Sequence, residues 1–383
     1  MTGGAHLTLR MGAVAATPAP AAVIDSLVEA QVNESTRGRG GFQLRFTYAE
    51  DSEMGREVVR GTLFEPPGRV IISVTLGGRE QVLADGVITR QDFAPANEAG
   101  QATLSLTGTD VSQMMDLFDL SAIPMPPMPP FGRVAFLLAK YAMYGVIPAA
   151  TPSILLMAPN PLEYLPIQRE TDYAYINRLA REAGYVFYVS AGPEPGMNIA
   201  YWGPEVKIGP TQSPLKVNMD GDSNVESFSV SYDGMKKDLY VLLYYNDLAR
   251  FPIPIPIPGI DPLNPPLGPR PPIPLGLKLL NRRDPDRESN EEEEEADTAN
   301  FDLARTAAKG LAAAARNADV VGASGSLDVQ RYGEVMRARR LVRVLGAGDL
   351  YSGNYYVDSV SSTLKPGSFK QSFRLSRNAR GTF

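Results

Sequence analysis

The sequence predicts a mainly β protein in which two related small β-barrel-like domains flank an α+β middle domain that contains helices. Three observations predict this class: β-rich runs fill both ends of the chain, helical spacing is confined to the middle, and the two ends share one strand pattern. With 383 residues, of which 44% are hydrophobic and 21% charged, the chain has enough apolar material for two or three cores.

Residues 1–110 are expected to form the first β domain. Their β-rich runs are separated by Gly, Pro and Asn, and several alternate apolar and polar residues, which is typical of strands buried on one face. The runs are LTLRMG, VIDSLVEAQV, FQLRFTY, RVIISVTL, GVITRQDF and ATLSLTG. The most basic short loop, RGRGG at 37–41, is interpreted as a mobile Gly-rich turn.

Residues 111–212 are expected to form the α+β middle domain. A first helix follows Asp110, which is placed as its N-cap, and a proline connector lies at 123–130. A second amphipathic helix, FGRVAFLLAKYAMYG, ends at Gly145, and MNIAYWG is predicted to be a strand.

The stretch QRETDYAYINRLAREAGYVFYV, residues 168–189, is dense in polar and aromatic side chains. Thr171 is predicted to be the N-cap of a helix, with Asp172 at the positive end of the helix dipole. Gly184 is placed just past the helix end, where a left-handed backbone favours glycine. One apolar stripe is predicted from Tyr173, Ile176, Leu179, Ala180 and Ala183, and a strand buried on both faces from 185–189. Because packing explains every tyrosine, the stretch is interpreted as scaffold.

Residues 213–383 are expected to form the second β domain, beginning with the strands SFSVSY and DLYVLLYY. A Pro-rich and Glu-rich insertion interrupts this domain at 250–297, and an Ala-rich helix follows at 298–318. Strand patterns resume from Ser326.

The insertion carries eleven prolines between 252 and 274, which favour an extended polyproline II backbone. The Ile–Pro alternation is excluded from a central strand, because proline donates no ladder hydrogen bond. Its apolar side chains are too numerous for free solvation, so we expect an extended arm that docks on a neighbouring subunit or a partner protein. The candidate docking residues are Phe251, Ile253, Ile255, Ile257, Ile260 and Leu263. The acidic run at 284–297 is expected to stay mobile in water.

A weak internal repeat connects the two predicted β domains. Residues 68–108 and 339–378 both run through a strand, a Gly-rich turn, a second strand, another turn and a third strand. The pattern predicts two related β domains on either side of the helical block.

Several chemistries are disfavoured by composition. The chain has no cysteine, its one histidine is His6 near the start, and GAGDLYSG lies between strands, so it is no dinucleotide-binding loop. The acids at 220–226 are interpreted as a turn, not as a calcium loop. A net charge of −6 argues against a nucleic-acid partner, and no apolar run is long enough for stable membrane insertion. The Pro-interrupted N-terminal apolar stretch is not taken as a secretion signal. No cofactor, metal or catalytic residue is assigned.

The motif at 168–185 resembles the late control protein D family, the baseplate hub proteins of contractile phage tails, which is related to the N-terminal hub part of VgrG spikes. LTGTDVSQMMD at 106–116 and the C-terminal YSGNYYVDSV and FRLSRN support the resemblance, which covers nearly the whole chain. The insertion departs from the pattern, and no C-terminal OB-fold or needle of the VgrG kind is recognised. The residues that match the family motif are Glu170, Thr171, Asp172, Tyr173, Ile176, Arg178, Leu179, Gly184 and Tyr185.

The resemblance implies a structural and non-enzymatic role. It implies a homotrimer whose two tube-like β domains per chain give six domains in a ring, so that the trimer adapts a hexameric tail tube to a trimeric spike. The implied partners are the tail tube or a tube-initiator protein, a separate spike protein and the inner baseplate or wedge proteins. The implied location is the virion tail baseplate or an injection particle, assembled in the bacterial cytoplasm.

Two alternatives come from other functional classes. One is a hub-associated cell-wall hydrolase that uses an unrecognised pair of acids, because nothing in the sequence singles out or removes such a pair. The other is a stand-alone binding module that uses the Pro-rich arm to dock on an aromatic groove.

Overall fold

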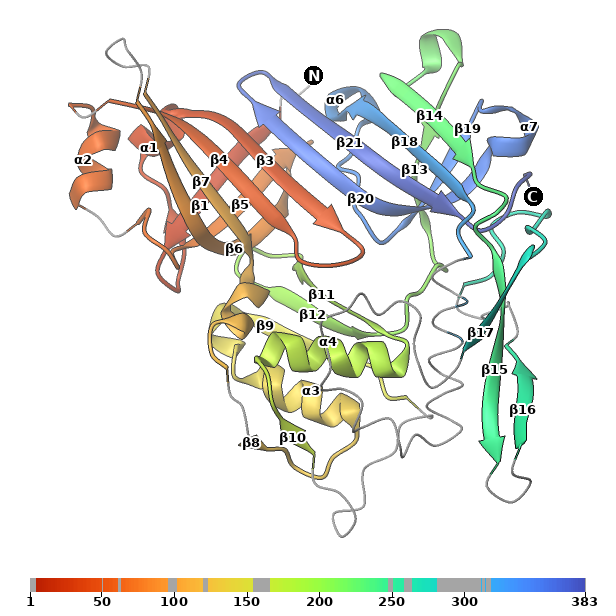
Figure 1. The fold of residues 1–383 in the computed structure, drawn as a ribbon. Helices are drawn as coiled ribbons and strands as arrows, with labels where there is room; N and C mark the ends of the chain where they lie inside the picture. The colour runs from red at the N-terminus through yellow and green to blue at the C-terminus, as the bar shows by residue number, and fades with distance from the viewer. Residues whose placement is uncertain are drawn as a thin grey trace.

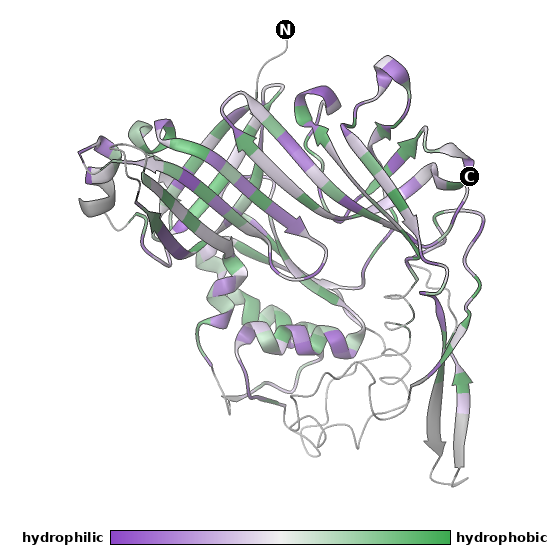
Figure 2. Ribbon diagram, turned by 45° about the horizontal axis from the view of Figure 1, so that its top comes forward, coloured by the Kyte–Doolittle hydropathy of each residue, from purple (hydrophilic) through white to green (hydrophobic). Residues whose placement is uncertain are grey.

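The computed structural model describes residues 5–49, 51–60, 63–95, 102–119, 123–153, 166–246, 251–257, 264–280, 311, 314 and 318–382. A 13-stranded sheet dominates it, and a smaller block of helices and strands lies against that sheet (Figure 1). Along the strands of the large sheet, hydrophilic and hydrophobic residues alternate (Figure 2), as expected for strands with one face in a core. The predicted fold class, mainly β with an α+β middle, is confirmed.

The first half of the large sheet comes from the N-terminal part of the chain. Its strands lie in the order β3-β4-β7-β6-β5-β1, with the short β2 (Thr17–Pro18) at the end. Two helices, α1 (Ala21–Asp25) and α2 (Glu53–Arg60), accompany them. The strands are β1 (His6–Gly12), β3 (Leu27–Ser35), β4 (Gly41–Tyr48), β5 (Arg69–Leu76), β6 (Arg79–Ala94) and β7 (Ala102–Asp110).

The second half repeats the same order with strands from the C-terminal part of the chain. It runs β14-β18-β21-β20-β19-β13, and β13 differs from its counterpart β1 because it pairs in parallel. The strands are β13 (Thr211–Lys216), β14 (Ser227–Tyr232), β18 (Val321–Asp328), β19 (Leu341–Leu345), β20 (Gly353–Lys365) and β21 (Ser368–Arg377). The short helices are η3 (Asp220–Asp222), α6 (Val329–Tyr332) and α7 (Gly348–Tyr351).

The repeat predicted from 68–108 and 339–378 is confirmed, because β5-β6-β7 and β19-β20-β21 occupy matching places. Both copies carry a β-bulge at the same position, after Ile88 in β6 and after Val357 in β20. The N–H of Ile88 donates to the carbonyl of Gly68, and the N–H of Val357 donates to the carbonyl of Arg340. A β-bulge bends a strand and changes the direction of its side chains, so the bulge at the same position in both copies is a structural feature of the repeated unit.

Antiparallel pairing of β3 with β20 joins the two halves into one sheet. We call this pairing the internal seam. Arg337 lies 2.6 Å from Glu34 beside the seam, and one apolar core runs beneath both halves. The two halves are therefore fixed to each other by backbone and side chains alike.

The middle block has its own core, whose buried side chains run from Val111 to Trp202. Its three-stranded sheet has the order β11-β12-β9, and two helices pack beside it (Figure 1). Its elements are η1 (Val111–Asp116), β8 (Ile123–Pro124), α3 (Pro130–Ala139), η2 (Ala142–Tyr144), β9 (Val146–Ala150), β10 (Ile167–Gln168), α4 (Asp172–Ala183), β11 (Val186–Ala191) and β12 (Asn198–Gly203).

Three local predictions were partly wrong. The run VIDSLVEAQV begins inside α1 and becomes strand β3 only at Leu27, because Pro20 and two alanines favour a short helical turn. The segment after Asp110 forms a 3-10 helix, although Asp110 does cap it by accepting from the N–H of Ser112. The strand after Gly184 is an edge strand with one buried face, so Phe187 and Val189 are buried while Tyr188 is only half-buried.

The Ile–Pro segment forms β16 (Phe251–Pro256), which pairs with β15 (Asp238–Asn246) of its own chain; β17 (Gly276–Leu280) lies on the other side of β15. The expectation of polyproline II is therefore wrong for β16, while its exclusion from a central position is correct. The N–H of Ile257 donates to the carbonyl of Tyr240. Because N–H directions alternate along a strand, the isoleucine N–H groups point toward β15 and the proline nitrogens point outward.

Part of the predicted arm thus packs on its own chain. Ile257 is buried with Tyr240, and Leu267 is buried against Leu341 and Tyr356. Ile260, Leu263 and the acidic run at 284–297 lie outside the described residues, as do the side chains of Phe251 and Ile253 and most of 298–318. Docking on another subunit stays a prediction.

Candidate functional site

Helix α4, the centre of the stretch at 168–189, is capped as predicted. Thr171 Oγ1 accepts from the N–H of Ala174 at 3.2 Å and donates to Asp116 Oδ1 at 2.5 Å. Gly184 has φ 71°, and the next N–H, that of Tyr185, donates to the carbonyl of Ala180 at 2.7 Å. The chain therefore reverses at Gly184 with the helix-end carbonyls satisfied.

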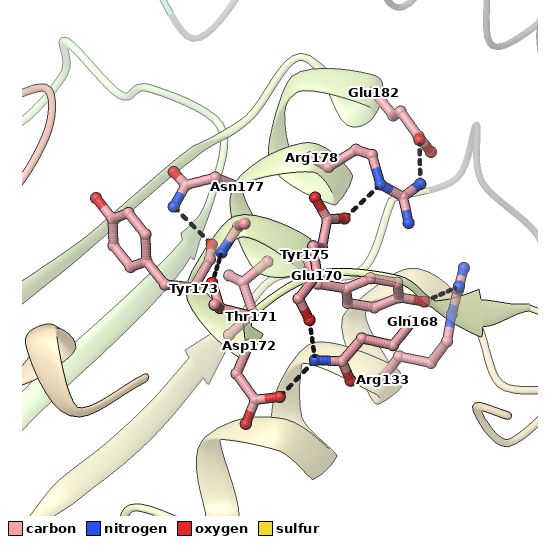
Figure 3. A network of polar contacts seen from close by, with 12 residues as sticks. Arg133, Gln168, Glu170, Thr171, Asp172, Tyr173, Tyr175, Asn177, Arg178 and Glu182 are labelled. Carbon is pink, nitrogen blue, oxygen red and sulfur yellow. Dashed lines mark hydrogen bonds and ion pairs between the residues drawn. The ribbon is translucent and has the colours of Figure 1, made fainter. Parts of the chain in front are cut away.

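Asp172 is only 1% exposed and lies among three donors, of which Gln168 is drawn in Figure 3. Its carboxylate accepts from Lys140 Nζ at 3.1 Å, Tyr141 Oη at 2.8 Å and Gln168 Nε2 at 2.7 Å. Burial, together with the hydrogen bond to Asp172, raises the pKa of Tyr141, which keeps its hydroxyl a donor. A carboxylate with all its oxygens engaged by the chain is a structural anchor and leaves no free base.

A second set of contacts holds the other side of α4. Arg178 Nε donates to Glu170 at 2.7 Å, and its Nη1 donates to Glu182 at 2.9 Å. Its guanidinium also lies 4.9 Å from the ring centroid of Tyr175, whose hydroxyl accepts from Arg133 at 2.5 Å. Tyr175 is fully buried, although the predicted stripe omitted it in favour of the half-buried Tyr173.

The loop RGRGG is a Gly-rich turn with Gly38 at φ 80°, but it also makes contacts that the sequence did not predict. Arg39 donates to Gln113 at 2.8 Å and to Asp116 at 2.7 Å, and its guanidinium lies 3.7 Å from the ring centroid of Tyr173. Arg39 thereby connects the first β half to the start of α4. The sequence holds no local signal for this contact, because more than 70 residues separate Arg39 from Gln113.

A buried ion pair forms another junction between the first half and the middle block. Arg69 Nη2 lies 2.7 Å from Asp85 Oδ2 and also donates to the carbonyl of Tyr144 at 2.7 Å. Asn198 Nδ2 donates to both Asp85 and the carbonyl of Tyr144. All of these groups are buried, so loss of one partner would leave another without compensation.

Arg339 ties the second half to the other two parts. It has a left-handed backbone with φ 63°, its guanidinium lies 3.9 Å from the ring centroid of Tyr188, and it donates to the carbonyl of Ser35. Arg339, Arg39 and Arg69 therefore connect the two halves of the large sheet and the middle block to one another.

Little of this arrangement suits catalysis. The acids of the family motif, Glu170 and Asp172, are engaged by cations, and among the described residues no group of three or more His, Asp or Glu could hold a metal ion. A surface hollow of about 730 Å³ lies beside β14 and α7, but Glu226 at its wall pairs with Lys370 at 2.7 Å. Within the part of the chain that the structure describes, no helix is long and apolar enough to span a membrane.

One acidic cluster lies away from the motif, at the bulge of β20 and beside the end of β21. Ser376 Oγ donates to Asp358 at 2.8 Å and to Asp319 at 3.3 Å, and Lys207 Nζ lies 2.5 Å from Asp319. Burial first, and then the charge of Asp319, raises the pKa of Asp358 to about 6, although the hydrogen bond from Ser376 opposes the shift.

We expect Asp358→Asn to raise the free energy of unfolding at pH 8 by about 2 kcal/mol and to leave it unchanged at pH 4. A carboxyl whose folded pKa is raised binds its proton more tightly in the folded state, so its stabilising effect is lost as pH rises through about 6. Asparagine keeps an acceptor for Ser376. Urea unfolding at the two pH values measures the difference, with the exposed Asp349→Asn as control; an equal gain at both pH values would contradict this account.

Comparisons with known proteins come from structure alone, because no family model and no curated protein matches the chain. A tail protein from Neisseria meningitidis MC58 is similar over 98% of this chain and 97% of that chain, with TM-score 0.59 and 13% identity. The 43 kDa tail protein of prophage MuSo2 from Shewanella oneidensis is similar over 98% of each chain, with TM-score 0.58 and 15% identity. A chain of the Francisella PdpA–VgrG complex is similar over 98% of this chain and 58% of its own length, with TM-score 0.58 and 10% identity.

At such identities, these similarities show the fold. The chain has, from end to end, the fold of phage tail proteins and of VgrG-like proteins, and the resemblance that the motif at 168–185 predicted is confirmed at that level.

Proposed function

We propose that this protein is the structural baseplate hub of a contractile phage tail or of a related injection particle. The observation that carries the proposal is the duplication of one six-stranded unit within a chain that shares its whole fold with phage tail proteins. The polar networks around α4 support a structural role, since they connect parts of the chain and leave no acid of the motif free.

The duplication suits a symmetry adaptor. Three chains with two similar units each present six units on one side, while the middle blocks keep three-fold symmetry on the other. We infer a homotrimer that joins a hexameric tail tube, or its initiator protein, to a separate trimeric spike. Inner baseplate or wedge proteins would contact the outer surface of this ring in the assembled tail.

The native mass of the purified chain tests the proposal. We expect a particle of three times the chain mass of 41.4 kDa, alone or together with the spike protein. Native mass spectrometry over a range of protein concentrations, with and without the co-expressed spike protein, measures it. A monomer under all these conditions would count against the hub.

An assay for peptidoglycan hydrolysis tests the enzymatic alternative. We expect no turnover above a heat-denatured sample, because the acids of the motif are paired with cations. The pair Asp319 and Asp358 is the candidate to remove if turnover is seen, since the pKa of Asp358 is raised to about 6, as a general acid requires. Turnover that disappears in Asp358→Asn would replace the purely structural proposal.

A further inference from the structure

The two strands of the internal seam each have a corresponding strand in the other half of the chain, and these two corresponding strands do not pair with each other. Strand for strand, β3 of the first half corresponds to β14 of the second, and β20 corresponds to β6. Since β3 pairs with β20, the matching contact would join β14 to β6. Within one chain β14 ends the sheet at one side and β6 lies far from it in the first half, so this contact requires two chains (Figure 1).

Both of these edges are open in the described structure. β14 pairs with β18 on one side only. Beyond Ile88, β6 pairs with β7 alone, because β5 reaches only to Val87. The corresponding part of β20 is covered by β3, whereas on β6 the side chains from Arg90 onward are largely exposed and Phe93 is 54% exposed.

We propose that β14 of one protomer pairs antiparallel with residues 89–94 of β6 in the next protomer, in the register of the internal seam. This inference rests on the proposed trimeric hub, and it names the surface through which the copies join. Three internal seams and three seams between chains would alternate around a closed ring of six units. Unpaired strand edges are the surface that proteins use for such pairing.

The shared bulge fixes the register on the β6 side. Ile88 pairs with Gly108 just before the bulge, and Val357 pairs with Leu375 just before the same bulge in the second half. Counting on from the bulge, the residues of β6 that match Ser359, Ser361 and Ser362 are Arg90, Asp92 and Phe93.

The ladders fix the register on the β14 side. Gly108 pairs with Phe42, which pairs with Val32; Leu375 pairs with Ala323, which pairs with Val230. Val230 therefore corresponds to Val32 of β3. The internal seam pairs Ser35 with Ser359, Asn33 with Ser361, and Val32 with Ser362. The seam between chains would accordingly pair Asp233 with Arg90, Ser231 with Asp92, and Val230 with Phe93.

The side chains in this register are complementary. An aspartate, Asp233, stands opposite an arginine, Arg90, and the half-buried Val230 would cover the exposed Phe93. Arg90 now pairs with Asp92 at 2.6 Å, on a side of the strand that stays polar against Ser231. A slip of one residue would set apolar side chains against polar ones. The side chains on the two faces of the strands therefore favour the same register as the one deduced from the strand pairings.

The backbone repeats as well. In the internal seam the N–H of Thr36 donates to the carbonyl of Asp358, the bulged residue. The matching pair is Gly234 and Thr89, and the Thr89 side chain is exposed. In the seam between chains, the N–H of Gly234 would therefore donate to the carbonyl of Thr89, as the N–H of Thr36 donates to the carbonyl of Asp358 in the internal seam.

Engineered cysteines test this seam directly, because the chain has no cysteine of its own. In Asp92→Cys/Ser231→Cys, directly opposed residues have Cα atoms about 4.5–5.5 Å apart, within disulfide reach. The matched control, Arg90→Cys/Ser229→Cys, sets cysteines four residues out of register, about 13 Å apart along the strand. We expect oxidation to yield covalent dimers and trimers in the first variant, on non-reducing denaturing gels, and none in the control or in either single cysteine variant.

Native mass separates this inference from the hub proposal. A trimer that fails to cross-link at these positions, or that cross-links equally in the control, would overturn the seam and leave the hub in place. A protein that stays monomeric would overturn both.

A charge exchange tests the register without cysteine. Arg90→Asp would set three acids together and weaken each seam about fivefold, and adding Asp233→Arg would restore the trimer. Trimer dissociation constants from the concentration dependence of the mass measure this, with Asp349→Arg as a surface control. A double variant no tighter than Arg90→Asp alone would overturn the pairing of these two residues.

Discussion

Asp85→Ala is expected to lower the free energy of unfolding by about 3–5 kcal/mol, the largest loss we predict for one side chain. Asp85 is 2% exposed and pairs with the buried Arg69, so its removal leaves a guanidinium without a counter-charge in the interior. It also removes an acceptor of Asn198 in the junction with the middle block. Chemical denaturation of the purified protein measures the loss.

The control for this prediction is Glu80→Ala. Glu80 lies on the same strand, β6, and pairs with Arg10 at 2.6 Å, but its side chain is 35% exposed. Water screens such a pair, so we expect a loss below about 1 kcal/mol. Replacing both members of the buried pair, as Arg69→Met/Asp85→Leu, should recover part of the stability, because no charge is then stranded, although the carbonyls of Val14 and Gly196 lose their donor. Equal losses in Asp85→Ala and Glu80→Ala would contradict the role given to burial.

Gly184→Val is expected to destabilise the protein by about 2–3 kcal/mol. At φ 71° a β-branched side chain meets its own backbone, and the chain must still reverse from α4 into β11. Gly184→Asn is the matched control, since asparagine tolerates this conformation and should cost about 1 kcal/mol or less. Thermal and urea unfolding of both variants test the order; equal stability of valine and glycine variants would show that the turn relaxes freely.

Local signals allowed the capping of α4 to be predicted from sequence. Thr171 and Gly184 stand at the two ends of a helical apolar pattern, and the physical reason for each acts within a few residues. The repeated strands were predictable for a similar reason, because period-two patterns and Gly-rich turns survive in both halves. The mainly β class followed from the same patterns.

Contacts between distant parts of the chain could not be predicted in this way. Asp172 was expected to face the helix dipole, and its buried contacts with Lys140 and Tyr141 depend on how α3 packs beside α4. Arg39 and Arg339 join segments that lie far apart in the sequence, so no window of residues records them. The pattern of the Ile–Pro segment was ambiguous because its period of two fits an edge strand as well as an extended arm.

The outward prolines of β16 have a consequence for how the protein behaves when many copies crowd together in a producing cell. A bare strand edge recruits further strands without limit, which is the route to fibres. Along β16, Pro252, Pro254 and Pro256 offer no N–H to an incoming strand, so growth of the small sheet stops there. The prolines at this edge therefore protect the protein from aggregation. Replacing these three prolines with threonine should leave β16 paired with β15 but make concentrated protein gel or precipitate.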